Sequence, residues 1–134
     1  MIGILIVSHG DIGTSLLTSA SQILGGEQKQ VATLSVWRAD EVDDLVLRAR
    51  ELMESLDSGD GVLVLTDIFG ATPGNVVSRL LEDGRIEGVS GASLPMLLRV
   101  LTGRNGSLSA AVKRALSGGA EGVVHMNNDR CCDA

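Results

Sequence analysis

Two short apolar runs constrain the fold of this chain more than any other feature of its sequence. Residues 2–7 read Ile-Gly-Ile-Leu-Ile-Val, and residues 61–65 read Gly-Val-Leu-Val-Leu. Neither run has alternating polar positions, so each predicts a strand that is covered on both of its faces. Strands of this kind are typical of the parallel sheet of an α/β domain.

Segments with helical periodicity alternate with these strands. Helices are expected over residues 13–24, 42–56, 73–81, 94–101 and 108–116, where apolar residues recur every three or four positions or a helix-start signal is present. Further strands are expected over residues 31–36, 86–90 and 122–126. The alternation predicts a doubly wound α/β fold, in which helices sandwich a mainly parallel sheet of strand order 2-1-3-4.

Length and charge exclude several classes of protein. A chain of 134 residues fits one compact domain, which we expect over residues 1–126, followed by a short tail over residues 127–134. The formal net charge of −6 argues against a nucleic-acid partner, because such proteins cluster Lys and Arg. No apolar run approaches the roughly 20 residues of a transmembrane helix, and no signal peptide is visible. We therefore expect a cytoplasmic protein without membrane insertion.

The two cysteines of the chain, Cys131 and Cys132, are adjacent to each other. This spacing suits neither a disulfide framework nor a metal site, so we expect both residues to belong to the tail. We expect neither a metal nor a cofactor.

Two loops are predicted to meet at one end of the sheet. In an open parallel sheet, ligands bind beyond the carboxyl ends of the strands, where the strand order reverses. For the order 2-1-3-4 this point lies between the first and third strands, so His9 is expected to face Asp67. Thr72 and Pro73, as N-cap and first residue of a helix, begin the helix that follows Asp67.

A histidine beside a carboxylate in such a position can act as a nucleophile. Asp67 can accept a hydrogen bond from one ring N–H of His9, which fixes the tautomer and leaves the other nitrogen free to attack phosphorus. A phosphate on that nitrogen needs hydrogen-bond donors, and helix starts provide free backbone N–H groups. Candidate donors are Gly10 after His9, together with Ala71 and the backbone and hydroxyl of Thr72.

Three motifs at the strand ends resemble those of a known family. They are Ser8-His9-Gly10, then Asp67 with Phe69-Gly70-Ala71-Thr72-Pro73-Gly74-Asn75, and Leu94-Pro95-Met96-Leu97. Their order and positions resemble the mannose-family enzyme IIA component of the bacterial phosphoenolpyruvate-dependent sugar phosphotransferase system. The resemblance extends from about Met1 to Met126.

The resemblance implies a phosphohistidine cycle. His9 would accept a phosphoryl group from the phosphocarrier protein HPr and pass it to an enzyme IIB, with Asp67 orienting the ring and Thr72 acting as a donor to the phosphate. Because the sequence ends soon after Met126, we expect the enzyme IIB acceptor to be a separate chain. Family members form homodimers that exchange a last strand, which corresponds here to residues 122–126. The resemblance leaves open whether the relay serves sugar uptake or regulation.

Four alternatives stay open at this point. The phosphoryl-donor subunit of a dihydroxyacetone kinase system has the same fold and histidine. A flavodoxin-like module would use the loop after the first strand for a cofactor phosphate, although the chain has few aromatic residues to stack on a flavin. A response-regulator receiver would be phosphorylated on Asp67, but Ser8 and His9 stand where its acidic pair would hold magnesium. The fourth alternative is a purely structural module.

Overall fold

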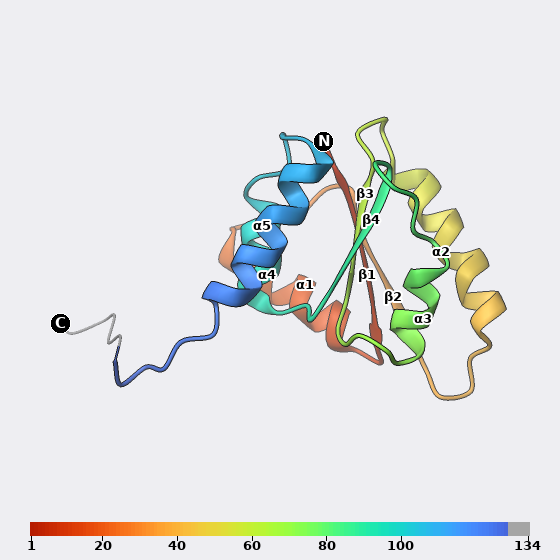
Figure 1. The fold of residues 1–134 in the computed structure, drawn as a ribbon, viewed down its shortest axis with the longest axis horizontal. Coiled ribbons are helices and arrows are strands. Elements are labelled where there is room, and N and C mark those ends of the chain that lie inside the picture. Colours follow the sequence, from red (N-terminus) through yellow and green to blue (C-terminus); the bar gives the residue numbers. More distant parts are fainter. Residues whose placement is uncertain (129–134) are drawn as a thin grey trace.

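A computed structural model describes residues 1–128 of the chain, and its centre is a four-stranded parallel sheet. The strands are β1 (Gly3–His9), β2 (Val31–Val36), β3 (Val62–Thr66) and β4 (Ile86–Ser90). Their order is β2-β1-β3-β4, so the predicted sheet and its order 2-1-3-4 are confirmed (Figure 1). Cys131, Cys132 and most of the predicted tail over 127–134 lie outside the described residues.

Helices cover both faces of the sheet. They are α1 (Ile12–Ile23), α2 (Val42–Leu56), α3 (Thr72–Ser78), α4 (Leu94–Leu101) and α5 (Leu108–Glu121). α2 and α3 lie on one face, and α1, α4 and α5 lie on the other (Figure 1). Among residues 1–128, no helix combines the length and the apolar character needed to cross a bilayer.

The central strands explain why the sequence has two uninterrupted apolar runs. Leu5 and Val7 of β1 pack with α2 and α3, whereas Ile4 and Ile6 of the same strand pack with α1, α4 and α5. β3 divides its residues between the two layers in the same way. Each fully buried aliphatic side chain stabilises the folded state by about 1.5–3 kcal/mol. The two central strands therefore hold the loops that follow them in fixed positions.

The start of α3 differs from the prediction by one residue. Ala71, not Thr72, is the N-cap, because the first helical hydrogen bond runs from the Asn75 N–H to the Ala71 carbonyl. The helix also ends at Ser78, and the chain continues into tighter turns in which Arg79 and Leu80 donate to carbonyls three residues back. Helix boundaries commonly shift in this way, since caps and turns compete for the same carbonyl groups.

The C-terminal part of the described chain differs more from the elements expected from the sequence. α5 continues to Glu121, whereas the expected helix ended at Leu116. Gly118 allows α5 to approach α4, because a Cβ atom there would lie 2.8 Å from the Cβ of Arg99. The strand expected over residues 122–126 is not formed within the single chain: residues 123–125 have no regular structure and a turn follows.

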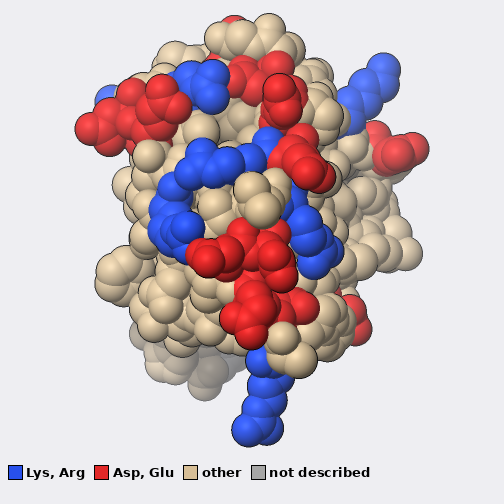
Figure 2. Space-filling view, turned by 90° about the vertical axis from the view of Figure 1, so that its right-hand side faces the viewer, with Lys and Arg blue, Asp and Glu red and all other residues tan. Residues whose placement is uncertain are grey.

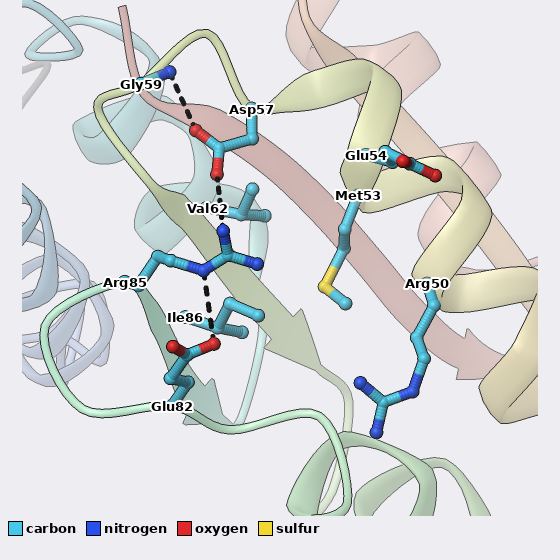
Figure 3. A pocket seen from close by; sticks show the side chains of 9 residues that line it. All are labelled: Arg50, Met53, Glu54, Asp57, Gly59, Val62, Glu82, Arg85 and Ile86. Carbon is cyan, nitrogen blue, oxygen red and sulfur yellow. Dashed lines mark hydrogen bonds and ion pairs between the residues drawn. The ribbon is translucent and has the colours of Figure 1, made fainter.

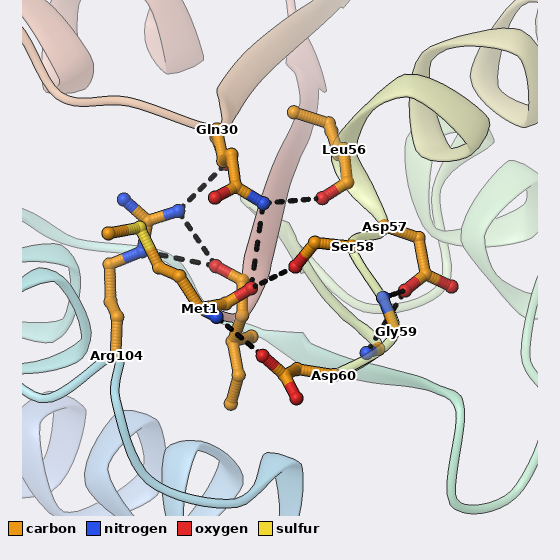
Figure 4. A network of polar contacts seen from close by, with 10 residues as sticks. Met1, Gln30, Leu56, Asp57, Ser58, Gly59, Asp60 and Arg104 are labelled. Atoms are coloured by element: carbon orange, nitrogen blue, oxygen red, sulfur yellow. Dashed lines mark hydrogen bonds and ion pairs between the residues drawn. The ribbon is translucent and has the colours of Figure 1, made fainter.

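A buried arginine joins the amino ends of the strands. The guanidinium of Arg104, in the loop between α4 and α5, donates to the carbonyls of Ile2, Lys29 and Gln30. Figure 4 shows Arg104 beside Gln30. Gln30 in turn donates from its side chain to the Leu56 carbonyl at 2.9 Å. The starts of β1 and β2 are thus tied to helices of both layers, at the end of the sheet opposite to His9.

Replacing Arg104 tests the contribution of this tie. Arg104→Ala should lower the free energy of unfolding by about 1–3 kcal/mol, because the carbonyl of the buried Ile2 would lose its guanidinium donors. Arg48→Ala is the control, since Arg48 is exposed on α2 and should change stability by less than about 0.5 kcal/mol. Urea unfolding followed by circular dichroism measures both values, and equal stabilities of the two variants would contradict the assignment.

Candidate functional site

The site is built on the turn that follows β1. Ser8, which is buried, accepts a hydrogen bond at its Oγ from the Gly13 N–H in the first turn of α1, at 2.8 Å. A Cβ atom on Gly13 would lie 2.9 Å from that same oxygen and 2.9 Å from Ile6. His9 therefore lies between Ser8 at the end of β1 and Gly13 in α1, which are joined by this hydrogen bond.

His9 and Asp67 meet as the sequence predicted. Nδ1 of His9 lies 2.8 Å from Oδ2 of Asp67, and the backbone N–H of His9 donates to the same oxygen at 3.1 Å. About half of the His9 side chain is exposed (48%), whereas only 10% of the Asp67 side chain is exposed. The carboxylate is therefore largely shielded from solvent beside Nδ1, while about half of the His9 side chain remains exposed.

The environment of Asp67 favours its ionised form. Burial by itself raises the pKa of the Asp67 carboxyl, but the hydrogen bonds from the ring and backbone of His9, together with the charge attraction between the two residues, lower it further than burial raises it. The net effect holds the pKa of Asp67 below its ordinary value. Asp67 is thus a carboxylate at neutral pH.

An ionised Asp67 determines which His9 nitrogen is free. A carboxylate only accepts hydrogen bonds, so Nδ1 must carry the proton in their contact. In the neutral ring the lone pair is then on Nε2, the nitrogen that makes no hydrogen bond in the described part of the chain. The geometry can therefore support a nucleophile at Nε2 and a carboxylate that offsets positive charge on the ring.

Gly10 is placed beside His9, but its amide is already used. The Gly10 N–H donates to the Val36 carbonyl at 3.0 Å, so it is not free to bind a phosphate. Gly10 has φ +47°, in the left-handed region that favours glycine. A Cβ atom on it would lie 3.2 Å from Cζ3 of Trp37, whose ring covers this side of the turn.

Trp37 is a neighbour of the site that the motifs did not indicate. It directly follows β2, at the same edge of the sheet as His9 and Asp67, and it is largely exposed. The rule that identified the other two residues, the carboxyl ends of adjacent parallel strands, applies equally to Trp37. Its position could therefore have been found from the sequence.

The other predicted donors lie at the start of α3. Ala71 and Thr72 end the loop that begins at Asp67, and both are half-buried. In the described structure, no hydrogen bond connects either residue to His9 or Asp67.

The third motif has a structural role in the core. Ser93 caps α4 by accepting a hydrogen bond from the Met96 N–H at 3.3 Å. Met96 and Leu97 are buried against the sheet, on the face covered by α1 and α5. The motif thus fixes α4 and contributes no polar group to His9.

A separate cavity of about 480 Å³ lies at the opposite end of the sheet, beside the first residues of β3 and β4 (Figure 3). Arg85 in its wall is already paired, at 3.1 Å with Glu82 and at 3.9 Å with Asp57. Acidic and basic side chains are also interspersed over the outer face of the helices on this side (Figure 2). The cavity is lined by three acidic side chains and two basic ones, and it is not part of the His9 site.

Comparison with known proteins agrees with the fold and with the motifs. A family model described as PTS system fructose IIA component matches residues 3–116. The "PTS system mannose-specific EIIAB component" of Escherichia coli (strain K12) is 33% identical over 91% of this chain, which spans only 38% of that relative. The "PTS system fructose-specific EIIA component" of Bacillus subtilis (strain 168) is 32% identical over 76% of this chain and 70% of its own length.

A solved structure is similar over nearly the whole chain. The phosphotransferase system component EIIA from Streptococcus agalactiae superposes with a TM-score of 0.84 at 28% identity, covering 96% of this chain and 99% of the other. The similarity therefore includes the strand ends that carry His9 and Asp67.

The hydrogen bond between His9 and Asp67 can be tested by titration. His9→Ala should raise the pKa of Asp67, because it removes the ring contact that lowers this pKa and retains much of the burial. Carbon-13 NMR of the Asp67 carboxyl measures the change, and His125→Ala, which removes the other histidine, should leave the titration unchanged.

The same shift predicts how stability depends on pH. Because the pKa of Asp67 is lower in the folded than in the unfolded state, its stabilisation is present above about pH 4 and is lost as pH falls through the folded-state value. The loss should be smaller in His9→Ala. An identical pH dependence in the two proteins would contradict the described contact.

Proposed function

The chain belongs to the mannose-type enzyme IIA family of the sugar phosphotransferase system, and on this premise we propose that it is a phosphoryl carrier that uses His9. It accepts a phosphoryl group from the phosphocarrier protein HPr on Nε2 of His9 and passes it to an enzyme IIB. The observation that carries the proposal is the contact of Nδ1 with the largely buried Asp67 carboxylate, which leaves Nε2 without a hydrogen bond on a ring that is half exposed.

The proposed step needs no metal and no external base. Nε2 attacks the phosphorus of the donor phosphohistidine, the P–Nε2 bond forms, and the donor P–N bond breaks with its electron pair going to the donor ring. His9 keeps its Nδ1 proton and becomes a phosphorylated imidazolium, whose positive charge is offset by Asp67. Transfer to enzyme IIB runs the same exchange with His9 as the donor.

Donors for the phosphate on His9 are proposed at the start of α3. The backbone N–H groups of Ala71 and Thr72 and the hydroxyl of Thr72 make no hydrogen bond within the described structure, so they can turn to a phosphate. The amide of Gly10 is bonded to the Val36 carbonyl and cannot serve as a donor. Gly10 would contribute instead by lacking a side chain, so that a phosphate can approach His9.

Mapping the phosphorylated residue tests the proposal. When the protein is mixed with phosphoenolpyruvate, the enzyme that charges HPr, and HPr, mass spectrometry should find one phosphate, on His9, that is labile to acid and stable to alkali. His9→Ala should lose all of this labelling and keep its fold, as measured by circular dichroism.

The matched control is His125→Ala, because His125 is exposed and hydrogen-bonded to Asn128 rather than to Asp67. Labelling of this variant should equal that of the wild type. Retained labelling of His9→Ala would exclude His9 as the carrier, and an alkali-labile phosphate would point to a carboxylate such as Asp67.

We also propose that the protein forms a homodimer through its C-terminal segment. β4 is an edge strand, paired on one side with β3. A cavity of about 340 Å³ beside it is lined by apolar residues that include Phe69, Leu81 and Leu116. The residues after α5 carry Val123, Val124 and Met126, all exposed, and a second copy of this segment can pair with the β4 edge and bury them.

Breaking this contact should yield monomers. Val124→Asp places a charge in the proposed apolar contact, so analytical ultracentrifugation should show a mass shift from dimer to monomer. Leu47→Asp, at an exposed position of α2, is the control and should stay dimeric. A monomeric wild type, or a Val124→Asp variant that stays dimeric, would reject the proposed strand exchange.

A further inference from the structure

We propose that Trp37 anchors the phosphocarrier partner beside His9; the inference rests on the proposed function. Trp37 is the one tryptophan of the chain, and 55% of it is exposed. Its ring edge lies over Gly10, the residue next to His9. A protein that brings its own phosphohistidine to Nε2 of His9 must cover this part of the surface.

The position of Trp37 is fixed before any partner binds. Its backbone N–H donates to Oδ2 of Asp40 at 2.8 Å, and its carbonyl accepts from the Asp40 N–H at 3.0 Å. The ring lies close to Gly10, where a Cβ atom would be 3.2 Å from its Cζ3. The backbone of Trp37 therefore has little conformational entropy left to lose on docking, which favours binding through its side chain.

Trp37 is one of several exposed apolar residues that follow the strands on either side of His9 at this edge of the sheet. Ile12 follows β1, Trp37 follows β2 and Ile68 follows β3, and all three are exposed. We call these three residues the docking face. Ile12 also lines an open groove between α1 and α4 with Leu16 and Leu94, so the apolar surface continues beside the site. Exposed apolar residues gathered at one edge mark a surface that another protein covers.

The charges around the docking face indicate the chemistry of that protein. Apart from Asp67, which is paired with His9, the loops that follow β1, β2 and β3 carry Asp11, Asp40 and Glu41 against a single cation, Arg38. The partner surface should therefore combine apolar residues with a net positive charge. Raising the salt concentration should slow the transfer, because long-range attraction is screened.

The experiment compares two phosphoryl donors. HPr must dock on the protein, whereas phosphoramidate is a small molecule that phosphorylates histidine without a docking surface. Trp37→Ala should raise KM for phospho-HPr about 10- to 30-fold with a nearly unchanged maximal rate, the usual loss for a central aromatic anchor. The rate with phosphoramidate should equal that of the wild type.

Two further variants make the comparison specific. Leu47→Ala removes an equally exposed apolar side chain on α2 and should leave both rates unchanged. Trp37→Phe keeps a ring beside Gly10 and should lie between the wild type and the alanine variant. If Trp37→Ala proves unfolded by circular dichroism, the loss in Trp37→Phe decides the question.

Each other outcome overturns a distinct claim. A Trp37→Ala variant that behaves like Leu47→Ala would show that Trp37 is no anchor. Equal slowing with both donors would show that Trp37 only positions the turn of His9. A wild type that accepts phosphate from phosphoramidate but not from phospho-HPr would reject the partner, and a wild type that accepts it from neither would reject the proposed function itself.

Discussion

The parallel pairing of β1 with β3 is the constraint on which the rest of the structure depends. Its register sets Val7 opposite Thr66, so that the next residues of the two strands leave the sheet side by side. His9 and Asp67 therefore meet without any long loop to bring them together. A shift of this register by one residue would exchange the two buried faces and separate the pair, which links the apolar core directly to the chemistry.

The sequence allowed the sheet, its order and the contact between His9 and Asp67 to be predicted, because strands buried on both faces leave a clear pattern and their carboxyl ends meet at one edge. The details that failed depend on contacts between distant segments. The extension of α5 to Glu121 includes Gly118, where α4 packs so closely that a Cβ atom would clash with Arg99. The bonds of Arg104 to the carbonyls of Ile2 and Gln30 likewise follow from the folded chain and not from spacing.

The two side chains of the site differ in exposure, because Asp67 is largely buried and His9 is half exposed. Asp67 is held in place by the sheet and by its contacts with His9, whereas the ring of His9 extends to the surface. In the proposed relay, phosphoryl exchange between two similar nitrogens is nearly balanced in free energy, so the reactive atom would have to be reached by a donor and an acceptor in turn. An open edge of the sheet suits this need better than an enclosed pocket, because release must be as easy as docking.

Trp37 has a consequence for how this protein can be observed. The chain contains no tyrosine and a single phenylalanine, so its near-ultraviolet absorbance and its intrinsic fluorescence arise almost entirely from that one indole ring. Because the ring rests on the turn next to His9, its emission reports on the polarity and charge at the carboxyl edge of the sheet. The protein thus carries an optical probe at its own site, and events there can be followed in real time without attaching a dye.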